Sequence, residues 1–403
     1  MSTAMQIGRT RRALLAALLV SGCAHEQKTS NNGPKLPPAK PEAVEAFKDG
    51  ARLVRLGPAN YERARERLEA AIALDPRLWE AEYDLGWLAL EARSHDAAGK
   101  HFERALAIYP RHTPSLLGLG RADDALGKAD QAAKAYRMYL DDRPRPEDAA
   151  PIRVALGGSL RRAGKLDAAV ETLREALKAE PRSASALAGL GMVYEQKGQH
   201  ELAELVLRRA LEIDPQSRLA ADVWNNLGLI ALHRRHDQEA FADFAAAAKI
   251  DPTLASARRN RAVVYLDCGD YDKAASELRD VVRGDASDGA AWVALGVAER
   301  GRGKLDDAEK AYRRAIEVDS SGPDGIDARY DLGVLFMDFR KDPKSARDAL
   351  AEFAKLAPGK HAKLADAQSR LKELAPKAEA TPQSGSQGTA PAAAPSNGKP
   401  GSR

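Results

Sequence analysis

Aromatic residues make up only 5% of this 403-residue chain, and long runs of β-branched residues are missing. Because strands are rich in both, the composition excludes an all-β protein and, with its abundant alanine, favours helices packed through small residues. Charge of one sign is also scarce, since the formal net charge is only +4. A nucleic-acid-binding protein needs a clear basic excess, so we predict no nucleic-acid partner.

The chain has two cysteines, Cys23 and Cys268, too few for a zinc ribbon or a disulfide scaffold. No HExxH motif is present, and residues 301–304 lack the earlier glycine and the following Ser or Thr of a phosphate-binding loop. We therefore predict that the protein is not an enzyme and uses no metal, cofactor or small-molecule substrate. Cys268 is expected to serve in packing, with a reactive thiol as the alternative.

The N-terminus has the pattern of a secretory signal over residues 1–22. Arg9, Arg11 and Arg12 form a charged stretch, and the eight residues 13–20 that follow are all apolar. A helix needs about 20 residues to cross a bilayer, so this run is too short to be a membrane anchor. We therefore expect the segment to be removed after export, by the general or the twin-arginine route.

The apolar run ends in Leu-Val-Ser-Gly-Cys at positions 19–23, which resembles the lipobox of bacterial lipoproteins. The resemblance implies that Cys23 becomes a lipid-modified N-terminus, anchored by several acyl chains. In that family an acidic residue after the cysteine often retains the protein in the inner membrane. Ala24 stands there instead, so the resemblance implies a lipid anchor in the outer membrane, facing the periplasm. A chance cysteine after a leader is the alternative.

Low-complexity segments flank the remaining chain. Residues 23–42 are polar and contain four prolines, which predicts an extended linker behind the lipidated cysteine. Residues 376–403 are rich in Pro, Gly and Ser and have no aromatic residue, which predicts a disordered tail.

Between these segments, small and large residues recur in register. A small residue stands at intervals of 34 or 37 residues, and the positions are Gly86, Gly120, Gly157, Gly191, Gly228, Ala262, Gly296 and Gly333. An alanine follows each of the first seven by twelve residues, and in the last repeat it is delayed by one, to Ala346. Large residues come four residues after the alanine, and they are Phe102, Tyr136, Leu173, Leu207, Phe244, Leu278, Tyr312 and Leu350. This spacing places alanine and large residue on one helix face.

These columns, together with a proline that closes most units, resemble the tetratricopeptide repeat. The resemblance implies an all-α fold, a right-handed α-solenoid of about nine helix pairs over residues 43–359, with units starting near 43, 79, 113, 150, 184, 221, 255, 289 and 326. Large residues are expected to fill the gap between neighbouring repeats. Glycines such as Gly127 are expected to end the first helices in the left-handed conformation. Residues 360–375 carry apolar residues at helical spacing, which predicts a capping helix.

In this family the first helices line a groove that binds proteins. By that resemblance we expect a protein-binding groove formed by Tyr83, Trp87, Asn225, Asn226, Arg259 and Asn260. An asparagine amide both donates and accepts hydrogen bonds, so Asn226 and Asn260 are candidates for holding the backbone of a bound peptide. Ordinary packing is the alternative for Trp87, and ordinary surface polarity is the alternative for the asparagines.

The combination of lipid anchor, linker and repeats resembles the tetratricopeptide lipoproteins of bacterial envelope machines. It implies a non-catalytic scaffold that binds envelope proteins, and we favour a role in a trans-envelope gliding-motility machine. The first alternative is a pilotin-like assembly factor for a type IV pilus or secretion secretin. The second, of another class, is a regulator of a periplasmic cell-wall enzyme.

Overall fold

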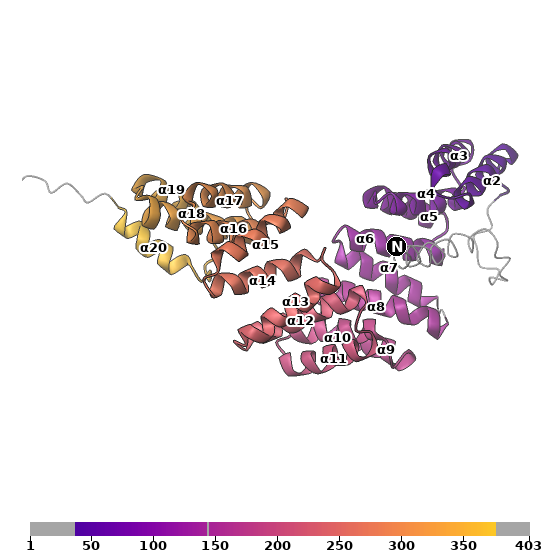
Figure 1. The fold of residues 1–403 in the computed structure, drawn as a ribbon. Helices are drawn as coiled ribbons and strands as arrows, with labels where there is room; N and C mark the ends of the chain where they lie inside the picture. The colour runs from indigo at the N-terminus through magenta and orange to yellow at the C-terminus, as the bar shows by residue number, and fades with distance from the viewer. Residues whose placement is uncertain (1–36, 143–144, 376–403) are drawn as a thin grey trace, which may run out of the picture. The chain divides into compact units, whose positions relative to one another are not determined.

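The computed structural model describes residues 37–142 and 145–375, and these ranges fold into helices joined by short turns (Figure 1). The all-α prediction is confirmed. The proposed signal segment 1–22, the start of the linker 23–42 and the tail 376–403 lie outside the described residues. The chain divides within one helix into two compact units, Met1–Val264 and Tyr265–Arg403, and each is considered by itself.

In chain order the described helices alternate between first and second helices of nine repeats and end in one final helix. The first helices are α2 (Pro41–Arg55), α4 (Trp79–Glu91), α6 (Thr113–Ala125), α8 (Pro146–Arg162), α10 (Ala184–Gln196), α12 (Arg218–His233), α14 (Ala255–Asp267), α16 (Gly289–Gly301) and α18 (Pro323–Val334). The second helices are α3 (Tyr61–Leu74), α5 (His95–Ile108), α7 (Ala129–Asp141), α9 (Leu166–Ala179), α11 (His200–Ile213), α13 (Asp237–Ile250), α15 (Tyr271–Gly284), α17 (Leu305–Val318) and α19 (Pro343–Leu356). Two short elements, η1 (Pro58–Asn60) and η2 (Leu335–Arg340), and the final helix α20 (Leu364–Glu373) complete the described part.

Two of the three longer sequence intervals appear as longer first helices. Helices α8 and α12 have 17 and 16 residues, whereas α4, α6 and α10 have 13. Three added residues make almost one helical turn, so the extension keeps the following helix in register. The unit boundaries expected near residues 150, 221 and 326 consequently fall inside α8, α12 and α18.

The last pair contains one further insertion. The interval from Gly333 to Ala346 is one residue longer than in the other units. The chain continues α18 as the π-helix η2, and Lys341 then turns back in the left-handed conformation with a φ of 57°. A π-helix holds one more residue per hydrogen-bonded turn than an α-helix, and this accommodates the extra residue.

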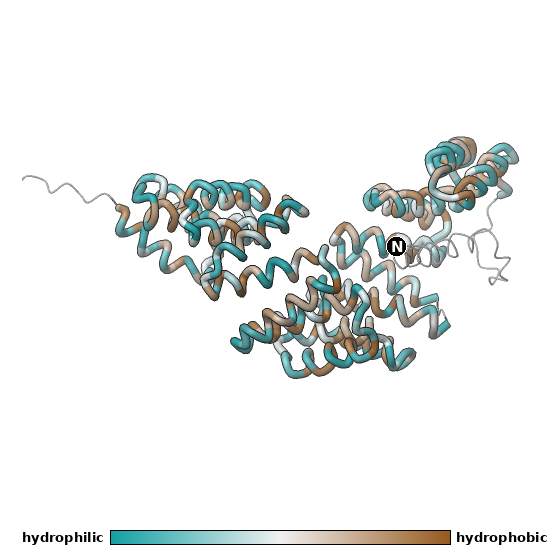
Figure 2. Tube along the Cα trace, viewed as in Figure 1, coloured by the Kyte–Doolittle hydropathy of each residue, from teal (hydrophilic) through white to brown (hydrophobic). Residues whose placement is uncertain are grey.

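Large residues of the second helices fill the space between first helices, as the columns predicted. The Phe102 ring is fully buried and lies between Gly86 of α4 and Gly118 of α6. A Cβ atom on these two glycines would lie 2.6 and 2.4 Å from the ring. Any larger residue would force the helices apart, because the interior is close-packed. Figure 2 shows the resulting alternation of hydrophobic and hydrophilic residues along the helices.

The turn after most first helices requires a left-handed residue. Gly127 has a φ of 72° there, as expected from its place after α6. Arg93 and Arg235, with φ values of 57° and 61°, adopt the same conformation in two other units. A side chain in this region is uncommon, so glycine is the residue that suits the turn best.

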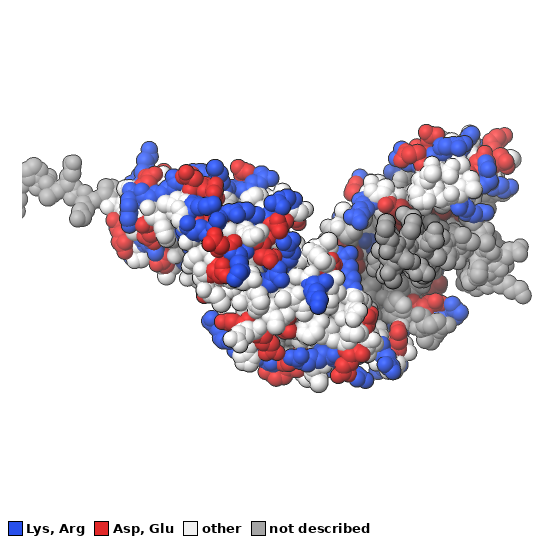
Figure 3. Space-filling model, viewed as in Figure 1, with Lys and Arg blue, Asp and Glu red and all other residues white. Residues whose placement is uncertain are grey.

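Charged residues connect neighbouring units at the surface. Lys165 Nζ lies 2.7 Å from Asp130 Oδ1, and Arg302 Nε lies 2.7 Å from Asp272 Oδ1 in the other unit. Each pair joins a residue near a turn to the first turn of the preceding second helix. Figure 3 shows Lys and Arg interspersed with Asp and Glu over the visible surface. Because such exposed pairs contribute only about 0 to 1 kcal/mol each, packing rather than charge holds neighbouring repeats together.

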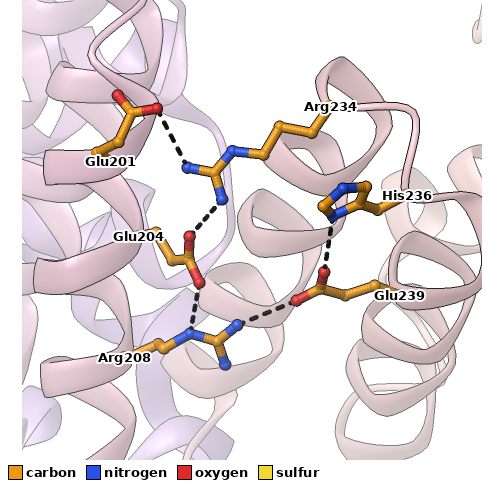
Figure 4. A network of polar contacts seen from close by, with 6 residues as sticks. All are labelled: Glu201, Glu204, Arg208, Arg234, His236 and Glu239. Carbon is orange, nitrogen blue, oxygen red and sulfur yellow. Dashed lines mark hydrogen bonds and ion pairs between the residues drawn. The ribbon is translucent and has the colours of Figure 1, made fainter.

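One larger polar network connects the fifth and sixth helix pairs (Figure 4). Its members are Glu201, Glu204, Arg208, Arg234, His236 and Glu239. Arg234 Nη1 donates to Glu204 Oε2 at 2.5 Å, and Arg208 Nε donates to Glu204 Oε1 at 2.8 Å. These two hydrogen bonds hold the pKa of Glu204 below its ordinary value. Glu204 is therefore ionised at neutral pH, and the two arginines balance its negative charge.

Asp243 lies beside this network and is buried, with 7% of its surface exposed. Burial, and then Glu239, raise its pKa to about 6, while Arg208 opposes the shift. The folded state thus binds a proton more tightly than the unfolded state, so this group destabilises the fold increasingly as pH rises from about 4 to 6. We expect Asp243→Asn to increase the free energy of unfolding by about 1 to 2 kcal/mol at pH 8 and to have no such effect at pH 4.

Urea titrations at the two pH values measure this difference. Asp237→Asn, at an exposed position in the first turn of the same helix, is the matched control and should show no gain at pH 8. A gain of equal size at both pH values would mean that the ionisation of Asp243 is not the cause.

Candidate functional site

A cavity of about 500 Å³ opens among α2, α4 and the residue that precedes α6, all in the first unit. Its volume lies in the range of roughly 300 to 1,000 Å³ that is usual for binding sites. The side chains around it are of three kinds: aromatic rings, two carboxyl groups on α4, and basic groups on α2.

Four rings form the aromatic wall of the cavity, from Phe47, Trp79, Tyr83 and His112. The ring centroids of Trp79 and His112 are 4.3 Å apart, and those of Tyr83 and His112 are 4.9 Å apart. Burial lowers the pKa of His112 to about 4, so this ring is neutral at pH 7. The wall is therefore an uncharged π-surface, in a chain with few aromatic residues.

The acidic side of the cavity consists of Glu80 and Asp84 on α4. Asp84 is 8% exposed and makes no hydrogen bond or ion pair with any residue in 37–142 or 145–375. Burial raises its pKa to about 7, the nearby Arg55 charge opposes this, and Glu80 adds to it. Burial also raises the pKa of Glu80. Asp84 is therefore a carboxyl group that lines the cavity and has no hydrogen-bond partner among the described residues, so a donor that enters the cavity can reach it.

The basic side consists of Lys48, Arg52 and Arg55, which lie on the solvent-exposed face of α2. Their spacing of four and three residues puts them on one face of the helix. Arg52 donates a hydrogen bond of 3.3 Å to Asp49, and all three side chains remain hydrated. The cavity thus has an aromatic and acidic wall that is buried or half-buried, and an exposed basic rim.

Two of the predicted groove residues, Tyr83 and Trp87, have different surroundings in the structure. Tyr83 lines the cavity, as a groove residue should. Trp87 is 7% exposed and packs against Phe102, with ring centroids 5.8 Å apart. The Arg121 guanidinium lies 5.4 Å from its ring centroid. The burial of Trp87 matches the packing alternative that the sequence left open.

The predicted asparagines lie further along the chain, on α12 and α14. Asn260 Nδ2 donates to Asn225 Oδ1 at 2.9 Å, and Asn226 Nδ2 donates to the Asp222 carbonyl at 2.7 Å. Asn225 is buried, whereas Asn226, Asn260 and Arg259 are half-buried. The structure therefore brings Asn225 and Asn260 together but places Asn226 against its own helix. Cys23 lies outside the described residues.

Sequence reasoning missed the acidic and basic sides of the cavity, although a signal exists. Lys48 and Asp84 stand two residues before Gly50 and Gly86, in the same repeat column as Asn226. Comparing this column across units would have placed Lys48 and Asp84 in one neighbourhood. The first repeat, near residues 43–76, has few of the residues that are typical of the other repeats. Its position in the column was therefore not recognised.

Other features of the described residues bear on the predictions. Within residues 37–142 and 145–375 no helix has the length and apolarity that a membrane crossing requires. The same ranges contain no cluster of three or more His, Cys, Asp or Glu side chains arranged for a metal ion. Cys268 is exposed, so its expected role in packing is wrong, because the residue lies at the end of α14 beside the turn rather than on its inner face.

Several known proteins are similar to parts of this chain. The bovine (Bos taurus) "BBSome complex member BBS4" is 23% identical over 321 residues, 78% of this chain and 58% of that protein. The chain spans less than two thirds of the length of the first curated relatives that it matches. Among solved structures, a chain of the APC/C hetero-tetramer Cut9–Hcn1 has a TM-score of 0.50 at 14% identity, covering 83% of this chain and 76% of that one. PilF of Pseudomonas aeruginosa has a TM-score of 0.48 at 21% identity, covering 56% and 98%.

Family models match most of the helix pairs. One model of the tetratricopeptide repeat matches residues 42–113, 154–218, 259–323 and 293–361, and a second matches residues 89–153. Together they cover more than half of the chain, in the ranges where the structure has paired helices. The chain therefore belongs to the tetratricopeptide repeat family.

Proposed function

We propose that this protein is a non-catalytic scaffold that binds envelope proteins and is held in the outer membrane, facing the periplasm, by lipid on Cys23. The observation that carries the scaffold role is the continuous use of Pro41–Leu356 for helix pairs of a protein-binding repeat. Each added pair extends the surface that such a repeat protein presents to a partner. The lipobox-like sequence that ends at Cys23 supports the anchor, and residues 24–40 supply a tether of at most about 60 Å.

The column of groove residues supports binding through the first helices. Asp84 in one repeat, and Asn226 and Asn260 in two others, stand at corresponding positions, two residues before Gly86, Gly228 and Ala262. The half-buried or buried polar groups at these positions offer hydrogen bonds to a partner chain. The bovine relative is by its name a member of a multi-protein complex, which supports an assembly role for this chain as well.

Within the envelope we favour a gliding-motility machine, on the resemblance of the lipid anchor, linker and long repeat array to lipoproteins of that class. A pilotin-like factor for a secretin is the alternative of the same kind. Regulation of a cell-wall enzyme is the alternative of another kind.

Affinity capture of the full-length chain from lightly crosslinked, detergent-solubilised envelopes tests these assignments. We expect motor or β-barrel subunits with the wild type and their loss with the double variant Asn226→Ala/Asn260→Ala. Lys341→Ala, at an exposed turn, is the control that should capture the same partners. A secretin in place of these subunits would favour the pilotin alternative. A cell-wall synthase as sole partner would contradict the motility assignment, and capture of no envelope protein would contradict the scaffold.

A further inference from the structure

The cavity among α2, α4 and α6 contains a buried acceptor that no described residue satisfies. We propose that this cavity binds an arginine side chain of a partner protein, with Asp84 accepting from the guanidinium, the aromatic wall stacking on it, and the α2 basic rim contacting acidic residues that flank the arginine. This inference rests on the proposed protein-binding function and names the chemistry of the bound segment.

The first step of the argument is the state of Asp84. Its side chain is more than nine-tenths buried, lines the cavity and has no donor within reach among the described residues. Arg55, which lies on the exposed face of α2, opposes the rise in the pKa of Asp84 without cancelling it. A ligand that brings a positively charged donor satisfies this carboxylate, whereas an anionic ligand at the same depth adds repulsion.

The second step concerns the rings. A guanidinium is planar and weakly hydrated, and it stacks on aromatic faces while its edge donates two parallel hydrogen bonds to a carboxylate. Trp79 and Tyr83 line the same cavity as Asp84, and the neutral His112 ring adds no repulsive charge. A lysine ammonium would gain the charge interaction but neither the stacking nor the paired hydrogen bonds. The combination of rings and carboxylate therefore favours arginine.

The third step concerns the rim. The rim residues lie on one side of the cavity and are exposed; they are Lys48, Arg52 and Arg55. Acidic residues next to the bound arginine would be attracted to these three cations, because all three line the cavity that receives the arginine. Exposed charges of this kind contribute to selection and association rate more than to affinity. The segment that fits is thus an arginine flanked by Asp or Glu.

Fluorescence anisotropy with a labelled peptide tests the proposal on the full-length chain. The probe is fluorescein-Gly-Glu-Arg-Glu-Gly-amide, and the matched peptide has citrulline, which keeps the shape of arginine without its charge. We expect the arginine peptide to bind at least tenfold more tightly than the citrulline peptide. We also expect its affinity to fall roughly tenfold from pH 8 to pH 6, as Asp84 takes up a proton, while the arginine and glutamate side chains of the peptide keep their charges. The citrulline peptide carries the same label and controls for the protonation of fluorescein in this pH range.

Two variants make the test specific. Asp84→Asn should weaken binding of the arginine peptide at least tenfold and abolish the pH dependence. Asp123→Asn is the control, because Asp123 is equally buried at 5% exposure, also has its pKa raised by burial, and does not line the cavity. Thermal unfolding of both variants checks that the fold is retained.

Equal binding of the arginine and citrulline peptides would overturn the proposal. So would tighter binding of fluorescein-Gly-Glu-Phe-Glu-Gly-amide that Asp84→Asn leaves unchanged, since the cavity would then take an acidic aromatic segment. If neither peptide binds while envelope capture still succeeds with Asp84→Asn, this inference fails and the scaffold function stands. If capture fails as well, the scaffold function fails with it.

Discussion

Replacing Phe102 with alanine is expected to lower the free energy of unfolding of the first unit by about 3 to 5 kcal/mol. The ring has no exposed surface and belongs to a cluster with Tyr83, Trp87, Ala98, Ala105 and Ala122. It also lies in the narrow space between Gly86 and Gly118, so its loss leaves a cavity between two first helices. Neighbouring glycines have no side chains that could close this cavity, and the cost therefore includes the void as well as the lost burial.

Urea unfolding, combined with hydrogen exchange resolved by segment, measures the effect. The loss of protection should concentrate in α4, α5 and α6, because each unit of a repeat protein is stabilised mainly by its neighbours. Phe339→Ala is the matched control, since this phenylalanine is 48% exposed in the other unit and should cost less than about 1 kcal/mol. A small effect of Phe102→Ala on the free energy of unfolding would contradict the close packing described above. So would a loss of protection that is spread evenly over the two compact units.

Replacing Cys23 with alanine is expected to release the protein from the outer membrane fraction entirely. Without the thiol no lipid is attached, and lipid-coupled removal of residues 1–22 cannot follow. Several acyl chains hold a protein on a membrane, whereas an unmodified linker has no comparable affinity. The measurement is fractionation of envelopes, together with the mass of the mature N-terminus.

Cys268→Ala is the control for this experiment, because the second cysteine is exposed and lies at the end of α14. This variant should remain in the outer membrane with an unchanged mass at the N-terminus. If Cys23→Ala fractionates with the outer membrane like the wild type, the lipobox interpretation is wrong and the location must have another cause.

The candidate site shows how far the repeat columns lead. Tyr83 was predicted as a groove residue by resemblance to a family whose first helices line a groove, and in the structure it lines the cavity. Trp87 stands in a neighbouring column, yet its ring turns against Phe102 and is buried. Positions next to the groove and positions between helices adjoin on one helix. Whether a side chain faces the groove or packs between helices depends on the neighbouring repeat. A sequence pattern within one repeat does not contain that information.

The asparagines illustrate the same limit. The amides of Asn226 and Asn260 were expected to be available to a peptide backbone. In the structure Asn260 donates a hydrogen bond to Asn225 of the preceding repeat. The two residues stand 35 positions apart, so only the stacking of the units brings them within hydrogen-bond distance. A partner that uses this pair must exchange one amide hydrogen bond for another, at little net change in free energy.

The sequence by itself determined the helix pairs, their order, the positions of the turns and the residues that fill the space between first helices. These features depend on contacts within about 34 residues and on the small volume of glycine and alanine, so they recur visibly in each unit. Only the tertiary structure decided that Phe47, Tyr83 and His112 meet around one cavity and that Asp84 is buried beside them without a partner. Phe47 belongs to the first repeat, whereas Tyr83, Asp84 and His112 belong to the second. Their burial and electrostatics depend on how neighbouring repeats pack, which no single period of the repeat encodes.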